Sequence, residues 1–133
     1  MDRSEYQKEY AEVHKDELKQ YRKDWYQENR NLPIVRFRQL KSSATRRNLL
    51  VGITFEYYQE LISTNICHYC PNELPVSGSG IDRLDHFKGY IVGNVVPCCW
   101  DCNARKGALE RAGFRYPRTI ELLREILGYN KSN

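Results

Sequence analysis

Apolar residues in the first thirty positions recur mostly at three- and four-residue steps. Charged residues lie between them, and neither Gly nor Pro interrupts the pattern. This periodicity is typical of an amphipathic helix, so we expect one long helix from Ser4 to about Arg30. The narrow, aromatic stripe favours packing against the rest of the domain, or against a second subunit in a homodimer, over a cofactor role. The stripe consists of Tyr6, Tyr10, Val13, Leu18, Tyr21 and Trp25.

The next stretch predicts two shorter helices. The Asn31-Leu32-Pro33 run ends the first helix, and a second is expected from Ile34 to Leu50. Thr54 is the expected N-cap of a third helix with the sequence FEYYQELIS.

The second half of the chain predicts a small mixed unit. SGSG at 77–80 indicates a turn, and residues 94–97 read as a strand. Two further helices are expected, over residues 103–112 and 119–127, and Gly128 ends the last one.

Length and composition favour one compact domain that contacts no membrane. The chain has 133 residues, of which 41% are hydrophobic and 29% charged. Its N-terminus lacks an apolar signal region, its five cysteines are an odd number, and no apolar run approaches the ~20 residues of a membrane helix. We therefore expect an intracellular, reduced protein without a signal peptide, which in a bacterial or phage-infected cell would mean the cytoplasm. A core of this size is often reinforced by a structural metal.

The net charge of +4 is unevenly distributed. Residues 1–32 carry 7 basic and 8 acidic side chains, whereas residues 33–66 carry 5 basic and 2 acidic ones. The five bases fall within twelve residues that contain no acid, which indicates either a solvated face or a phosphate-binding face. They are Arg36, Arg38, Lys41, Arg46 and Arg47.

Two Cys-x-x-Cys pairs are the strongest chemical signal. Cys67 and Cys70 form the first pair, Cys99 and Cys102 form the second, and 28 residues separate the pairs. Four thiolates at this spacing can close a tetrahedral Zn²⁺ site. Cys98 could compete as a ligand, but Cys99 has the correct interval to Cys102, so we expect Cys98 to be a small buried side chain.

The runs CHYC, IDRLDHFKGY and NVVPCCWDCNARKG resemble the HNH nuclease family, over roughly Ile66 to Gly107. The Asp-Arg-x-Asp run followed by Gly-Tyr is similar to the subgroup that includes PacI-type restriction enzymes. The resemblance implies an α+β fold, with a zinc-stapled ββα-metal core and flanking helices. The expected organisation is a helix over 1–32, a basic helical region over 33–66, the nuclease core over 67–112, and a C-terminal helix and tail over 113–133.

The resemblance also implies a catalytic site. Asp82, Asn94 and Asn103 fall on the family's site positions, and Asp82 and Asn103 offer oxygen ligands that suit a Mg²⁺-like ion. Arg83 stands where the family usually has its general-base His. Because a guanidinium is a poor base, a phosphate clamp is the role expected of Arg83.

The base that activates water is left to two residues. His86 is favoured by its chemistry near neutral pH, whereas Tyr90 is favoured by the Gly-Tyr resemblance, with Arg83 as the nearby cation. Of the two, the resemblance makes Tyr90 the residue that we expect to activate the water. Asn94 is expected to brace the loop between them through backbone hydrogen bonds. Arg105 and Lys106, in the turn after Asn103, are expected to anchor phosphates.

The predicted function is therefore metal-dependent cleavage of DNA, with zinc as structural and Mg²⁺ or a similar ion as catalytic cofactor. A sequence-specific enzyme, acting as a homodimer, competes with a homing-type nickase and with a junction resolvase. A zinc-ribbon nucleic-acid-binding protein without activity is the alternative from another class.

Overall fold

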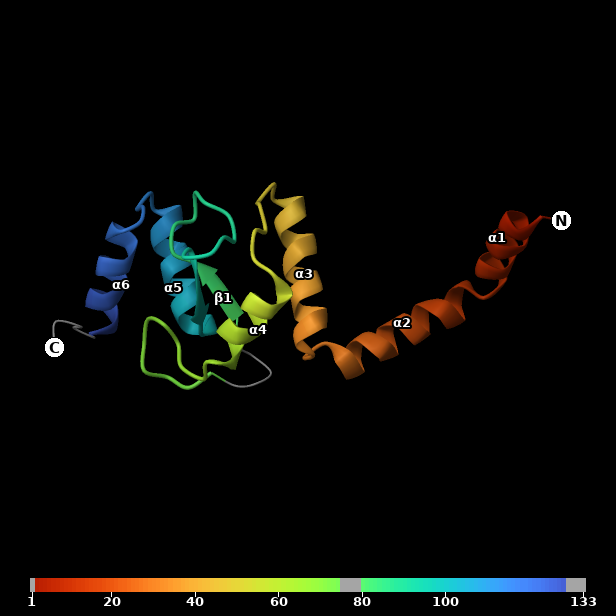
Figure 1. Cartoon of the computed structure of the whole chain (residues 1–133), viewed down its shortest axis with the longest axis horizontal. Coiled ribbons are helices and arrows are strands. Elements are labelled where there is room, and N and C mark those ends of the chain that lie inside the picture. The colour runs from red at the N-terminus through yellow and green to blue at the C-terminus, as the bar shows by residue number, and fades with distance from the viewer. Residues whose placement is uncertain (1, 75–79, 129–133) are drawn as a thin grey trace.

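The structure is a computed structural model that describes residues 2–74 and 80–128. Six helices and two strands lie in these residues (Figure 1). They are α1 (Arg3–Val13), α2 (Lys15–Asn29), α3 (Pro33–Arg46), α4 (Phe55–Ser63), β1 (Gly80–Arg83), β2 (Val95–Cys98), α5 (Trp100–Arg111) and α6 (Arg118–Leu127). The predicted turn at 77–80 lies outside the described residues, except for Gly80, which begins β1. Within the described chain, no helix combines the length and the apolar character needed to cross a bilayer.

The N-terminal segment differs from its prediction in two ways. It forms two helices that meet at His14, whose φ of −101° and ψ of 17° depart from helical values. The aromatic stripe does not pack on the domain, because α1 and α2 contain no buried residue and extend away from the body in Figure 1. At the base of this arm, Gln39 Nε2 donates a hydrogen bond to Tyr26 Oη at 2.7 Å.

α3 ends earlier than predicted because the chain turns to pair with a later loop. Asn48 adopts a left-handed φ of 56°, which helices do not continue through. Beyond it, Tyr90 N donates to Leu50 O at 2.8 Å and Gly52 N donates to Tyr90 O at 2.7 Å. The approach is so close that a Cβ on Gly89 would lie 2.5 Å from Leu50 O. Residues 50–52 thus fix the position of Tyr90.

α4 begins and ends as predicted. Thr54 is its N-cap, and the Thr54 Oγ1 accepts a hydrogen bond from Tyr57 N at 3.1 Å. The last helix, α6, also matches its prediction to within one residue, and Gly128 ends it in the left-handed conformation with φ of 74°.

The antiparallel hairpin of β1 and β2 divides the core in two. Its register pairs Gly80 with Cys98 and Arg83 with Val95. Side chains alternate across a strand, so Val95 packs in a cluster with residues of α3 and α4, while Val96 packs in a cluster with residues of α5 and α6. The fold is α+β, and the hairpin lies between the two helical pairs. α5 begins at Trp100, three residues before the predicted start.

Candidate active site and four-cysteine cluster

The four predicted cysteines come together. Their Sγ atoms all lie within 4.8 Å of one another, and no other cluster of potential metal-ligating His, Cys, Asp or Glu was found among the described residues. Backbone N–H groups point at the sulfurs: Tyr69 N and Cys99 N each lie 3.4 Å from Cys67 Sγ. Burial raises the pKa of Cys67, but these and other hydrogen bonds lower it to about 7 overall. The cluster could hold a metal such as zinc.

Cys98 stands apart from this cluster, as predicted. Its side chain is buried, and its thiol donates to Cys99 O at 3.2 Å. Burial raises the pKa of Cys98 far above its ordinary value, so the thiol stays neutral.

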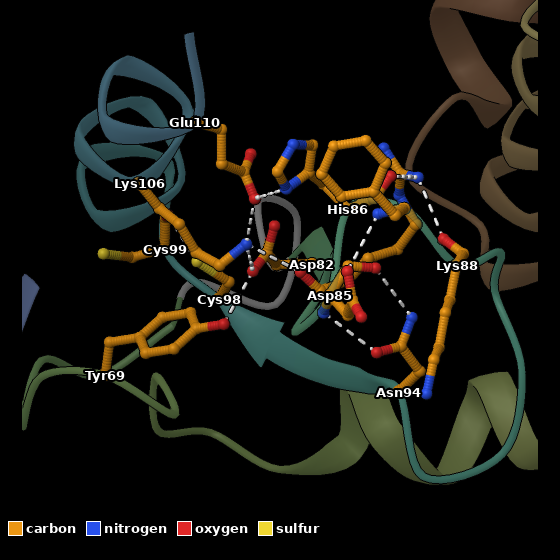
Figure 2. Close-up of polar contacts among 12 residues, drawn as sticks. Tyr69, Asp82, Asp85, His86, Lys88, Asn94, Cys98, Cys99, Lys106 and Glu110 are labelled. Carbon is orange, nitrogen blue, oxygen red and sulfur yellow. Dashed lines mark hydrogen bonds and ion pairs between the residues drawn. The ribbon is translucent and has the colours of Figure 1, made fainter. Parts of the chain in front are cut away.

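Asp82 is a buried carboxylate on β1 that faces α5. Its Oδ2 accepts a hydrogen bond from Tyr69 Oη at 2.7 Å and lies 3.2 Å from Lys106 Nζ. Burial raises the pKa of Asp82, while the charge of Lys106 and the bond from Tyr69 oppose that shift. Figure 2 shows Tyr69, Asp82, Lys106 and Glu110 directed toward one another. These contacts hold the side chain of Asp82 in one orientation.

Lys106 does not occupy the surface position that the sequence predicted for a phosphate anchor. Its side chain is 1% exposed, and its ammonium donates to Arg83 O at 2.7 Å and to Glu110 Oε2 at 2.6 Å. A phosphate cannot reach it without breaking these contacts. The reason is helical periodicity, because position 106 of α5 faces the hairpin, whereas Arg105 faces solvent and pairs with Asp101 at 3.2 Å.

His86 belongs to the same cluster of polar side chains as Asp82. Its Nδ1 lies 3.2 Å from Glu110 Oε2, and both side chains are mostly covered, at 22% and 17% exposed. A continuous series of polar contacts therefore runs from Tyr69 through Asp82, Lys106 and Glu110 to His86 (Figure 2).

Asn94 braces the loop, as predicted. Its Oδ1 accepts from Asp85 N at 2.9 Å, and its Nδ2 donates to Asp85 O at 3.1 Å and to Gly89 O at 2.9 Å. Because the side chain is buried and all three bonds go to backbone, Asn94 shapes the loop that carries His86.

Tyr90 and Arg83 lie on the opposite side of the hairpin from Asp82. Tyr90 is buried in the cluster with α3 and α4, and its Oη accepts a hydrogen bond from Arg47 Nη2 at 2.9 Å. The Arg83 guanidinium lies 5.5 Å from the ring centre of Tyr90 and donates to the backbone oxygens of His86 and Lys88. Strand alternation explains the separation, since Asp82 and Arg83 are neighbours on β1.

The remaining predicted residues are distributed between α3 and α5. Asn103 is exposed and precedes Lys106 by three positions, which places both on one face of α5. On α3, Arg38, Lys41 and Arg46 are exposed, and Arg36 is half-buried. Arg47 is exposed but bonded to Tyr90. Lys41 and Arg46 help to line a shallow surface depression.

The sequence did not single out two of the residues that the structure brings to this site. Tyr69 lies between the first two cysteines, and Glu110 lies one helical turn after Lys106. For Glu110, the four-residue spacing from Lys106 was a usable signal of an ion pair. For Tyr69, nothing in the local sequence indicated a contact with β1.

Comparisons with known proteins support the fold. No protein-family model matches the sequence. A 74-residue segment, 56% of the chain, is 32% identical to the uncharacterized protein R423 of Acanthamoeba polyphaga mimivirus and accounts for 14% of that protein. Among solved structures, the rare-cutting HNH restriction endonuclease PacI matches with a TM-score of 0.55 and 19% identity, over 71% of this chain and 76% of that one. The chain has an HNH-like fold.

Proposed function

We propose that this protein is a metal-dependent endonuclease that hydrolyses phosphodiester bonds in DNA and belongs to the Asp-Arg subgroup of HNH nucleases. One observation carries the proposal: a buried, oriented carboxylate, Asp82, lies on the first strand of an HNH-like hairpin and faces the helix that starts at the four-cysteine cluster. A carboxylate fixed at such cost in desolvation is typical of a functional site.

Zinc is the metal that we propose for the cluster of Cys67, Cys70, Cys99 and Cys102. Four sulfur donors within 4.8 Å fit its tetrahedral coordination. Cys99 is the N-cap of α5 and Cys102 lies in its first turn, so an ion bound there would fix the start of the helix. Asn103 follows directly, and its position would then depend on the structural ion.

The second metal site that we propose uses Asp82 and Asn103. A carboxylate and an amide oxygen are the ligand types that Mg²⁺ accepts. Asp82 lies on β1, and Asn103 is an exposed residue of α5 on the helix face that carries Lys106. A bound divalent ion would stabilise negative charge on the phosphate and on the leaving oxygen. Asp82 would present its Oδ1 for this role, because Oδ2 already bonds to Tyr69 and contacts Lys106.

For the base that activates water, we propose His86 in place of the Tyr90 that the resemblance led us to expect. His86 lies on the Asp82 side of the hairpin, where its Nδ1 is 3.2 Å from Glu110 Oε2, and an imidazole is a suitable base near neutral pH. Tyr90 is buried on the other side of the hairpin and its hydroxyl is bonded to Arg47. Arg83 and Asn94 would then hold the loop rather than contact the scissile phosphate.

Side-by-side cleavage by His86→Ala and Tyr90→Phe tests this choice across a range of pH. We expect His86→Ala to lose most activity and Tyr90→Phe to keep it. If Tyr90→Phe is inactive while His86→Ala is active, the residue that activates water is Tyr90, with Arg47 and Arg83 as its neighbouring cations.

Exposed bases on both sides of the core supply the DNA contacts in this proposal. Arg38, Lys41 and Arg46 lie on α3, and Arg105 lies on α5. Arg36 and Arg47 can extend less far toward a phosphate, because Arg36 is half-buried and Arg47 bonds to Tyr90. Neutralising phosphates releases counterions, so the affinity should depend steeply on salt.

Incubation with supercoiled plasmid in Mg²⁺ and in EDTA tests the proposed class. Discrete linear fragments that need Mg²⁺ would indicate a sequence-specific enzyme whose sites act in pairs, as a homodimer would. Open circles would indicate a nickase, and cleavage confined to branched DNA would indicate a resolvase. DNA binding with no cleavage in any divalent ion would favour the inactive zinc-ribbon alternative.

A further inference from the structure

We propose that Tyr69 is a positioning residue that links the four-cysteine cluster to the catalytic carboxylate. The proposal rests on the proposed function, in which Asp82 binds the catalytic ion. Tyr69 would make the affinity of that ion depend on the structural zinc, although the residue contacts neither substrate nor the reacting atoms.

The backbone of Tyr69 belongs to the cysteine cluster. The residue lies between Cys67 and Cys70, and its N–H donates to Cys67 Sγ at 3.4 Å. If the Cys67 thiolate binds zinc, its fixed position would also hold the main chain of Tyr69 in place. The ring is 1% exposed, so packing leaves it little freedom to turn.

The side chain of Tyr69 ends at Asp82. Its Oη donates to Asp82 Oδ2 at 2.7 Å in a buried environment, where an ionised acceptor makes the bond strong. The hydroxyl is the donor in this pair, because an ionised carboxylate oxygen can only accept. Lys106 Nζ lies 3.2 Å from the same oxygen.

Two donors on one oxygen leave the other oxygen of Asp82 for a metal. Removal of a group that orients a metal ligand typically weakens metal binding about 10- to 100-fold. Because coupling between two binding sites is reciprocal, an ion at Asp82 would also tighten the binding of zinc to the cysteines.

The first test measures Mn²⁺ binding to zinc-loaded protein by calorimetry, without DNA. We expect Tyr69→Phe to keep one zinc per chain and to bind Mn²⁺ about 10- to 100-fold more weakly. Tyr58→Phe is the matched control, since it removes a buried phenol hydroxyl in the cluster on the other side of the hairpin. Asp82→Ala gives the Mn²⁺ binding expected when the proposed site is absent.

The variants distinguish failure of the proposed metal site from failure of the role of Tyr69. If Asp82→Ala binds Mn²⁺ as well as the wild-type chain, the catalytic ion lies elsewhere and the proposed site fails together with this inference. If Asp82→Ala loses the ion while Tyr69→Phe matches Tyr58→Phe, the site stands and the role of Tyr69 is refuted.

A second measurement does not depend on the folding of Tyr69→Phe. In equilibrium competition with a zinc-selective dye, the wild-type chain should bind zinc more tightly at saturating Mg²⁺, and Mg²⁺ should have no such effect on Asp82→Ala. Equal zinc affinities with and without Mg²⁺ in the wild-type chain would contradict the link.

Discussion

Replacing Lys106 by Met should destabilise the protein strongly, although a surface lysine at this position would tolerate the change. The ammonium is 1% exposed and lies among Asp82, Glu110 and the carbonyl oxygen of Arg83. Met fills a similar volume without charge, so two mostly buried carboxylates would lose the cation between them. Removing one partner of a buried ion pair costs about 3–5 kcal/mol.

The decrease in the free energy of unfolding caused by Lys106→Met should depend on pH in a defined direction. Burial already raises the pKa of Asp82 above its ordinary 3.8, and Lys106 opposes that shift. Without Lys106 the folded-state pKa should rise further. A group whose pKa is raised by folding stabilises the fold below its unfolded pKa and loses that contribution as pH rises through the folded value. The deficit of Lys106→Met relative to the wild-type chain should therefore be larger at pH 8 than at pH 5.5.

Urea unfolding at the two pH values, each with zinc present, measures this deficit. Arg105→Met is the matched control, because Arg105 is the adjacent base and its pair with Asp101 is exposed, which is worth about 0–1 kcal/mol. Equal free energies of unfolding for the two variants would refute the buried position of Lys106, as would a weaker salt dependence of DNA binding in Lys106→Met.

Two further predictions follow from the metal cluster and from the basic surface. Cys67→Ser should lose zinc and unfold the core, whereas Cys98→Ser should keep one zinc per chain. Elemental analysis measures the zinc content and circular dichroism measures the folding of each variant. Zinc lost only from Cys98→Ser would reverse the ligand assignment. Neutralising Arg38 and Arg46 together should lower the log–log slope of DNA affinity against salt by roughly one to two units. An unchanged slope would place the DNA on another surface.

The sequence predicted the parts of the fold that depend on local chemistry. The spacing of the cysteines was sufficient to group them, and the Thr54 cap and Gly128 determined where α4 begins and α6 ends. Asn94 was correctly expected to bond to the loop backbone, because a short amide after a glycine-containing loop commonly does so.

The sequence could not predict on which side of the hairpin each side chain lies. Asp82 and Arg83 are adjacent in the chain, and both were assigned to one site, but alternation on β1 sends them to opposite sides. The burial of Lys106 and the contact of Tyr69 depend on how α5 and the cysteine cluster pack against β1. Such contacts join segments far apart in sequence, and local patterns do not encode them.

The break at His14 was also absent from the local pattern. The apolar periodicity continues across it, and the hydrogen bonds from His14 N to Tyr10 O and from Leu18 N to His14 O persist. His14 also lies 3.1 Å from Glu17 Oε2 and 4.2 Å, between ring centres, from Tyr10.

In the proposed mechanism, Asp82 and Asn103 hold the ion required for DNA cleavage. The most direct test of this assignment compares the wild-type chain with Asp82→Ala and Asn103→Ala, each shown to contain one zinc and to bind DNA. The measured quantity is the Mg²⁺-dependent rate of plasmid cleavage. We expect both variants to lose cleavage by several orders of magnitude while zinc content and DNA affinity stay unchanged. Cleavage by Asp82→Ala at the wild-type rate would contradict it.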